Sequence, residues 1–179
     1  MNIEKASVTL LVALTFCGAG TSEGKDSHSS EQLQFSAADA GVDRPVPMPQ
    51  GVWNVLRTDE LVRDTLKGED ISPEKIPLSW FSVSAIHLSS SKKVDFVVMG
   101  EGPLRGANVI PFWVFCATAR GYAMVLTAPA FELDVKNTRW KGHRDIELSS
   151  LTAVQMSTVS LRFDGERYVE YRSTSEPIK

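Results

Sequence analysis

The sequence predicts a mainly β protein, α+β at the margin, in which one amphipathic helix precedes an antiparallel sheet of about seven or eight strands. Apolar residues recur with a helical period between residues 52 and 66, and from residue 80 onward the period is two. Short turn segments join the later apolar runs, which is typical of a meander or half-barrel. With 179 residues, 42% of them apolar and 23% charged, the chain is long enough for one domain with a hydrophobic core.

Residues 1–20 have the pattern of an export signal peptide, with Lys5 in a short head, an apolar run over residues 6–16 and small residues after it. The run has about eleven residues, whereas a membrane-spanning helix needs about 20. Leu14-Thr15-Phe16-Cys17 is similar to a bacterial lipobox, in which Cys17 would carry the lipid, although Phe16 is larger than that pattern uses. The alternative is cleavage near Ala19. Both alternatives predict a periplasmic or extracellular protein, attached to a membrane only through such a lipid.

Residues 21–50 are rich in Ser, Gly, Asp and Glu and end in a proline-spaced stretch. Such a segment has too few apolar side chains to offset the entropy of ordering, so we expect a flexible, disordered tether. The alternative is an ordered arm that uses Leu33 and Phe35. We expect a single domain over residues 51–172 and a C-terminal tail over residues 173–179.

One amphipathic helix of about four turns is expected after the prolines, ending near Gly68. A single stripe holds its apolar residues, which are Val52, Val55, Leu56, Val62 and Leu66.

Eight apolar runs with a period of two follow, and each is expected to form a strand. Residues 109–117 are apolar on both faces, which predicts a central strand with Trp113 in the core, and residues 131–135 alternate as in a strand nearer an edge. The apolar parity changes within residues 153–163, which predicts a β-bulge near Ser157-Thr158. The other expected strands cover residues 80–88, 93–99, 122–127, 144–148 and 168–171.

Asp164-Gly165 is the strongest hairpin signal in the chain. A two-residue loop would set Arg162 opposite Arg167, and like charges destabilise a cross-strand pair. We therefore expect a four-residue loop that sets Phe163 opposite Tyr168.

Several chemistries have no support in the sequence. Cys116 lies in an apolar run and should be a buried thiol, and with Cys17 lost to the signal peptide no internal disulfide is expected. The three histidines are scattered, there is no glycine-rich phosphate loop, and no serine has the setting of a nucleophile. A net charge of −3 disfavours nucleic acid as a partner. We expect no metal, no cofactor and no catalytic residue.

The motifs VDFVVMG at residues 94–100, FWVF at 112–115, GHRDI at 142–146 and RFDGERY at 162–168 resemble a widespread class of small exported bacterial β-rich proteins of unassigned activity. Together with shorter motifs, the resemblance covers about residues 80–172. In many such chains an Asp-rich loop, similar to the FG-GAP calcium-binding hairpins, precedes the first motif. Here that loop is degenerate, because only Asp95 remains. Calcium takes about six to eight oxygen ligands, and one remaining acid is too few, so we expect no calcium ion at this loop.

These observations favour a non-enzymatic binding or inhibitory module of the bacterial envelope, with an envelope or secreted protein as its partner. An inhibitor and a scaffold fit equally well, and the ligand and the oligomeric state stay open. The alternative is a small hydrolase using the polar cluster Arg139–Glu147, with His143 within hydrogen-bond reach of Asp145 beside a cleft. We expect Trp140 to be partly exposed. The candidate binding residues are Trp140, His143, Arg144 and Asp145 near one turn, and Arg105 and Asn108 in the loop over residues 101–108.

Overall fold

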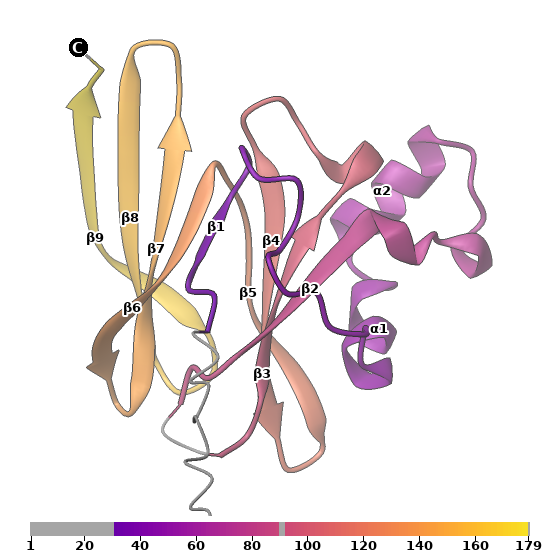
Figure 1. Cartoon of the computed structure of the whole chain (residues 1–179), viewed down its shortest axis with the longest axis horizontal. Coiled ribbons are helices and arrows are strands. Elements are labelled where there is room, and N and C mark those ends of the chain that lie inside the picture. The colour runs from indigo at the N-terminus through magenta and orange to yellow at the C-terminus, as the bar shows by residue number, and fades with distance from the viewer. Residues whose placement is uncertain (1–30, 90–91, 179) are drawn as a thin grey trace, which may run out of the picture.

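The computed structural model describes residues 31–89 and 92–178, which form two antiparallel sheets and a helical layer (Figure 1). The predicted mainly β fold is confirmed, and neither sheet closes into a barrel. The five-stranded sheet has the order β1-β6-β7-β8-β9, with β1 (Gln34–Ser36), β6 (Glu132–Trp140), β7 (His143–Leu151), β8 (Gln155–Phe163) and β9 (Tyr168–Pro177). The four-stranded sheet has the order β2-β3-β4-β5, with β2 (Phe81–Ile86), β3 (Asp95–Gly100), β4 (Ile110–Thr118) and β5 (Gly121–Ala130).

The chain passes from one sheet to the other at Phe131, which joins β5 to β6. Backbone hydrogen bonds fix this corner, because the Phe131 N–H donates to Ser149 O and the Ala37 N–H donates to Phe131 O, at 2.8 and 2.7 Å. One side of the five-stranded sheet is thereby held over the four-stranded sheet. The helices lie against the opposite side of the four-stranded sheet (Figure 1).

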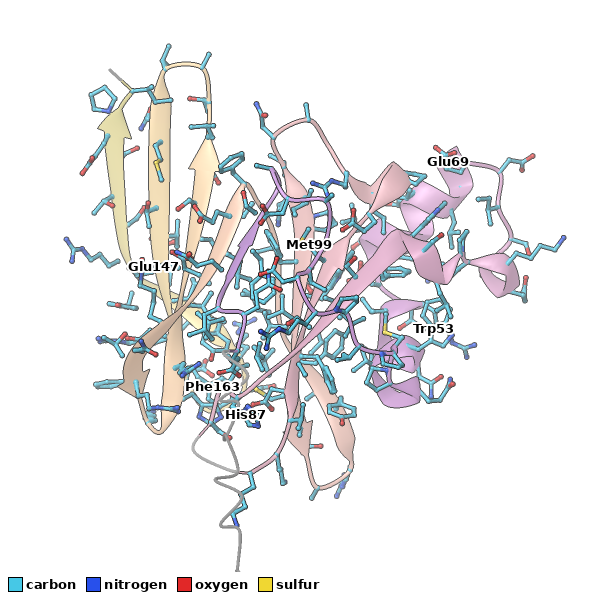
Figure 2. The ribbon with its side chains drawn as sticks, in the orientation of Figure 1. Trp53, Glu69, His87, Met99, Glu147 and Phe163 are labelled. Atoms are coloured by element: carbon cyan, nitrogen blue, oxygen red, sulfur yellow. The ribbon has the colours of Figure 1, made fainter. Side chains whose placement is uncertain are left out.

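Two hydrophobic clusters hold these layers together. The first lies between the sheets and includes Phe112, Leu133 and Ile146, each fully buried. The second lies between the four-stranded sheet and the helices and includes Trp113 and Phe115. Because β4 contributes to both clusters and pairs with β3 and β5, the predicted central strand and core position of Trp113 are confirmed. Figure 2 shows Met99 near the middle of the molecule and Trp53 among the helices.

The predicted single helix is two helices, α1 (Gln50–Leu56) and α2 (Glu60–Gly68). The chain breaks between them because Asp59 starts a new helix, where its carboxylate accepts hydrogen bonds from the N–H groups of Leu61 and Val62. The predicted apolar stripe still faces inward, since Val52, Leu56, Val62 and Leu66 are buried. Three short 3₁₀ turns complete the helical structure, at Pro73–Lys75, Leu78–Trp80 and Gly102–Leu104.

The predicted disordered tether is wrong for residues 31–50, and the alternative, an ordered arm using Leu33 and Phe35, is confirmed. Strand β1 pairs with β6, and Phe35 is fully buried between the sheets while Leu33 packs against the same cluster. Farther along, the Val46 N–H donates to Val83 O at 2.9 Å. Composition misled the prediction because one buried aromatic ring and a strand edge are enough to order a short arm.

Residues 1–30 lie outside the described residues, and with them the expected signal peptide, Cys17 and the first part of the tether. No helix in the described part of the chain is long and apolar enough to cross a membrane.

The C-terminal hairpin is partly as predicted. Phe163 pairs with Tyr168 across a four-residue loop, and the Asp164 carboxylate accepts hydrogen bonds from two backbone N–H groups of that loop. The expected bulge near Ser157-Thr158 is wrong, because β7 and β8 pair without interruption from Leu151↔Met156 to Ile146↔Leu161. Val154 and Met156 are exposed, so no bulge is needed to turn them inward.

The expected C-terminal tail over residues 173–179 is wrong as far as Pro177, because β9 continues to that residue. It pairs with β8 over its whole length, from Phe163↔Tyr168 to Gln155↔Pro177. The far ends of β7, β8 and β9 extend beyond the four-stranded sheet (Figure 1).

Candidate functional site

The side of the five-stranded sheet that faces away from the four-stranded sheet is here called the outer face. Side chains alternate along a strand, and Leu133, Val135 and Ile146 are buried between the sheets, so their neighbours in β6 and β7 point outward. Glu147 is one of these, and Figure 2 shows it on the five-stranded sheet, away from the helices. This face carries polar groups together with two large aromatic rings.

The guanidinium group of Arg162 lies against those two rings. Its central carbon is 3.8 Å from the centroid of the Tyr171 ring and 4.8 Å from the centroid of the Trp140 ring. Both distances are within the range of cation–π contacts. Trp140 and Tyr171 remain 45% and 44% exposed as residues. We call this group the Trp140–Arg162–Tyr171 stack.

A tight turn places Trp140 in the stack. Trp140 is the last residue of β6 and pairs with His143 across the two-residue turn Lys141-Gly142. Both turn residues have positive φ, 48° and 81°, which matches the hairpin turn that follows the twist of the strands. Lys141 Nζ also donates a hydrogen bond to Asp164 O at 3.2 Å, so the turn is tied to the next hairpin.

A β-bulge places Tyr171 in the stack. Leu161 pairs with Glu170 and Ser160 pairs with Arg172, so Tyr171 is the extra residue of β9 at this point. Bulges of this kind redirect a side chain, and here the redirected ring covers the guanidinium group.

Asp145 lies next to Arg162 and is only 3% exposed. Its Oδ2 accepts a hydrogen bond from Thr138 Oγ1 at 2.9 Å, while its Oδ1 is 3.6 Å from Arg162 Nε. Neither Oδ1 nor Nε has a hydrogen-bond partner among the described residues. The carboxylate therefore attracts the near edge of the guanidinium group without occupying its N–H donors.

The neighbouring charges on the outer face are paired. Lys136 Nζ lies 2.8 Å from a Glu147 carboxylate oxygen and 3.7 Å from one of Asp134. The hydrogen bond from Lys136 holds the pKa of Glu147 below its ordinary value, and the same bond raises the pKa of Lys136. Each of these groups is held in its charged form by the other, which suits a stable surface better than proton transfer.

The predicted site residues near the turn are divided between two environments. Trp140 and Asp145 belong to the stack and its support, and the partial exposure expected for Trp140 is confirmed. Arg144 instead forms an ion pair with Glu31 at 2.9 Å, and the His143 ring packs on Phe163 with centroids 4.2 Å apart. No hydrogen bond between His143 and Asp145 occurs in the described structure, since the Asp145 carboxylate faces Thr138 and Arg162.

The structure does not bring Arg105 and Asn108 into this site. Arg105 holds the N-terminal arm, where its guanidinium group donates to Ala37 O and Asp39 O and pairs with Glu101 at 2.8 Å. Asn108 is exposed in the loop before β4. Arg105 is thus a structural residue.

Sequence reasoning missed Arg162 and Tyr171, although one signal pointed to Arg162. A four-residue loop with Phe163 facing inward places Arg162 outward, on the same face as Asp145.

The polar groups between the sheets serve the fold. Asp95, the remaining acid of the loop that resembles FG-GAP hairpins, is 2% exposed and accepts hydrogen bonds from the N–H groups of Leu88 and Ala117. No group of three metal-binding side chains occurs in the described residues. Cys116 is buried as predicted, and burial, with a smaller effect of Asp95, raises its pKa to about 12.

Two surface hollows lie away from the turn. One, of about 510 Å³, lies between β5 and β9 and is lined by residues 124–127 and 167–170. The other, of about 490 Å³, lies beside β1 and β6 and is lined by residues 31–34, 43–44 and 134–137. Neither is lined by His143 or Asp145, so neither supplies the cleft that the hydrolase alternative requires.

Comparison with family models, curated proteins and solved structures finds no match to this chain. The resemblance to small exported bacterial proteins stays a prediction.

Proposed function

We propose that this protein is an exported, non-enzymatic binding module and that the outer face of its five-stranded sheet binds another protein. The observation that carries the proposal is the Trp140–Arg162–Tyr171 stack. Trp, Tyr and Arg are the residues most enriched at the energetic centres of protein interfaces, and here all three are in contact on one exposed face.

The open shape of the site favours a protein partner over a small molecule. Small ligands bind in concave sites that bury most of their surface, whereas both rings of the stack are nearly half exposed. A protein partner brings its own large surface and covers such rings by docking on them. The rings also keep few rotatable bonds, so ordering them on binding costs little entropy.

The geometry gives the hydrolase alternative less support. A general acid or base needs a reacting proton within hydrogen-bond reach and a pKa near the working pH. In the cluster Arg139–Glu147, the Asp145 carboxylate faces Thr138 and Arg162, and Lys136 keeps Glu147 ionised. The thiol of Cys116 is protonated and buried.

Export is part of the proposal and rests on residues 1–20. The test is the mass of the protein recovered from the cells that make it. Cleavage near Ala19, or a lipid-modified Cys17 as the first residue, supports a periplasmic or extracellular location. A full-length chain retained in the cytoplasm contradicts it.

Site-specific photo-cross-linking tests the binding surface. Benzoyl-phenylalanine replaces Tyr171 in the full chain, and a control chain carries it at Leu61, which is 42% exposed on α2. We expect a protein adduct from position 171 that weakens at least fivefold with Trp140→Ala, and none from position 61. Equal adducts from both positions, or an adduct at 171 that ignores Trp140→Ala, contradict the proposal. Thermal melts show whether each variant is folded.

A further inference from the structure

We propose that the group recognised by the Trp140–Arg162–Tyr171 stack is a carboxylate, carried by an Asp or Glu side chain of the partner protein and bound by the free edge of Arg162. This inference rests on the proposed function and specifies its chemistry. Arg162 donates the hydrogen bonds to the ligand, and the two rings and Asp145 hold Arg162 in place.

The donors of Arg162 are available for a ligand. A guanidinium group carries five N–H donors, and none of them forms a hydrogen bond with a described residue. The side chain is 36% exposed although its Nε is buried, so the exposed part lies elsewhere in the side chain. Nε lies 3.6 Å from Asp145 Oδ1, and the two terminal nitrogens form a separate edge of the guanidinium group. Two parallel N–H groups at such an edge match the two oxygens of a carboxylate.

The two aromatic rings restrict how a ligand can approach. They lie 3.8 and 4.8 Å from the guanidinium carbon, so contacts with ring atoms already occupy its surroundings. A ligand therefore forms hydrogen bonds by approaching the guanidinium group along its edge, in the plane of its N–H donors.

Asp145 orients Arg162 and leaves its donors free. One of its oxygens bonds to Thr138, and the other is 3.6 Å from Nε, which is longer than a hydrogen bond. A buried carboxylate with an unpartnered oxygen is unusual and needs a reason. Here the reason is that Asp145 holds the cation by charge, which makes it a positioning residue. Arginine can face two carboxylates at once because each uses a different edge.

The local charge count favours a carboxylate over a phosphate. Lys136, the nearby lysine of β6, is paired with Glu147, and Lys141 Nζ donates to a backbone oxygen. Arg172 lowers the pKa of Glu147 by its charge, so it also acts on an acid of the protein itself. Arg162 offers a single positive charge, part of which Asp145 already balances, and this suits a singly charged anion better than a phosphate with nearly two charges.

Nuclear magnetic resonance tests this without substitution of the site. The ¹⁵N-labelled full chain is titrated at constant ionic strength with sodium acetate, with sodium chloride and with sodium phosphate. We expect acetate to shift the Arg162 Nε–H and Trp140 indole N–H signals with saturation, at a Kd on the order of 10–100 mM for so small a probe. Chloride should leave both signals in place. Tighter binding of phosphate than of acetate, or equal shifts with chloride, overturns the inference.

Three variants then separate charge from geometry. Arg162→Gln should abolish the acetate response, and Arg162→Lys, which keeps the charge but loses the planar fork, should weaken it at least fivefold. Arg172→Gln removes an arginine on the adjacent strand and should leave the response unchanged. An equal response in Arg162→Lys and the unsubstituted chain shows that the fork is not used, and this contradicts the inference.

The two proposals fail in different ways. If position 171 cross-links to a protein but acetate moves neither signal and Arg162→Gln keeps the yield of adduct, the module stands and the carboxylate inference is wrong. If acetate binds but position 171 captures no protein, the proposed function is wrong.

Discussion

Replacing Phe35 with alanine tests whether the N-terminal arm is part of the folded domain. The ring is fully buried in the cluster between the two sheets, and it belongs to the three-residue strand β1. The composition around it predicts a tether, so the substitution compares the two interpretations directly. If the arm were only a tether, the substitution would leave the unfolding free energy unchanged.

The size of the effect follows from burial. A Phe→Ala change in a packed core costs about 3–5 kcal/mol of unfolding free energy, which sums the lost transfer of the ring and the cavity left behind. The arm is tied on both sides of the ring, by the β1–β6 ladder and by the hydrogen bonds from Arg105 to Ala37 O and Asp39 O. It cannot easily detach to relieve the cavity. At about 2–4 °C per kcal/mol for a domain of this size, the melting temperature should fall by about 6–20 °C.

Calorimetry and urea unfolding of the full chain measure the change. Gln34→Ala is the matched control, because it alters the same strand at an exposed position and should shift the unfolding free energy by less than about 0.5 kcal/mol. A loss below about 1 kcal/mol for Phe35→Ala would refute the reasoning and restore the tether.

Four further predictions concern single side chains. Trp140→Ala should change the unfolding free energy by less than about 1 kcal/mol in urea titrations, since the residue is nearly half exposed, and it should weaken binding of the partner protein. A large fall in melting temperature would place the ring in the core. Native Cys116, whose pKa is raised to about 12, should react with iodoacetamide at pH 8 on the order of a thousandfold more slowly than in urea, and a fast native reaction would contradict its burial. Lys136 lowers the pKa of Glu147, so this pair stabilises the fold above the ordinary carboxyl pKa, and the contribution is lost as pH falls through the lowered value. Glu147→Gln should therefore flatten the acid side of a plot of unfolding free energy against pH. The change should be less than about 1 kcal/mol because both groups are about one-third exposed. Asp145→Asn should weaken the acetate response of the Arg162 Nε–H signal several-fold, and an unchanged response would show that Asp145 does not position the arginine.

Much of the sheet structure could be predicted from the sequence because it depends on local patterns. Residues 110–116 of the predicted central strand are buried on both faces, and the Asp164-Gly165 signal placed Phe163 opposite Tyr168. Local cross-strand charge repulsion was enough to choose the loop length there.

The errors came from contacts between segments that are far apart in the sequence or from competing local bonds. Phe35 is buried by β6 and by the second sheet, which composition near the residue cannot reveal. The helix was broken by the Asp59 cap although the apolar stripe continued through it. Val154 and Met156 were assumed to be buried, but they are 71% and 41% exposed.

The candidate site was predicted in part. The partial exposure of Trp140 was predicted, and Asp145 was among the candidate residues near the turn. The stack itself could not be predicted, because Tyr171 contacts Arg162 through a bulge in the pairing of β8 with β9. Register shifts of this kind depend on the assembled sheet and not on a local pattern.

The yield of adduct from position 171 in the cells that make the protein tests the central claim most directly. The account predicts one dominant protein adduct that Arg162→Gln removes and Arg172→Gln retains, with none from position 61. An adduct that persists in Arg162→Gln would contradict recognition through the arginine, and one that forms from position 61 alone would contradict binding through this face.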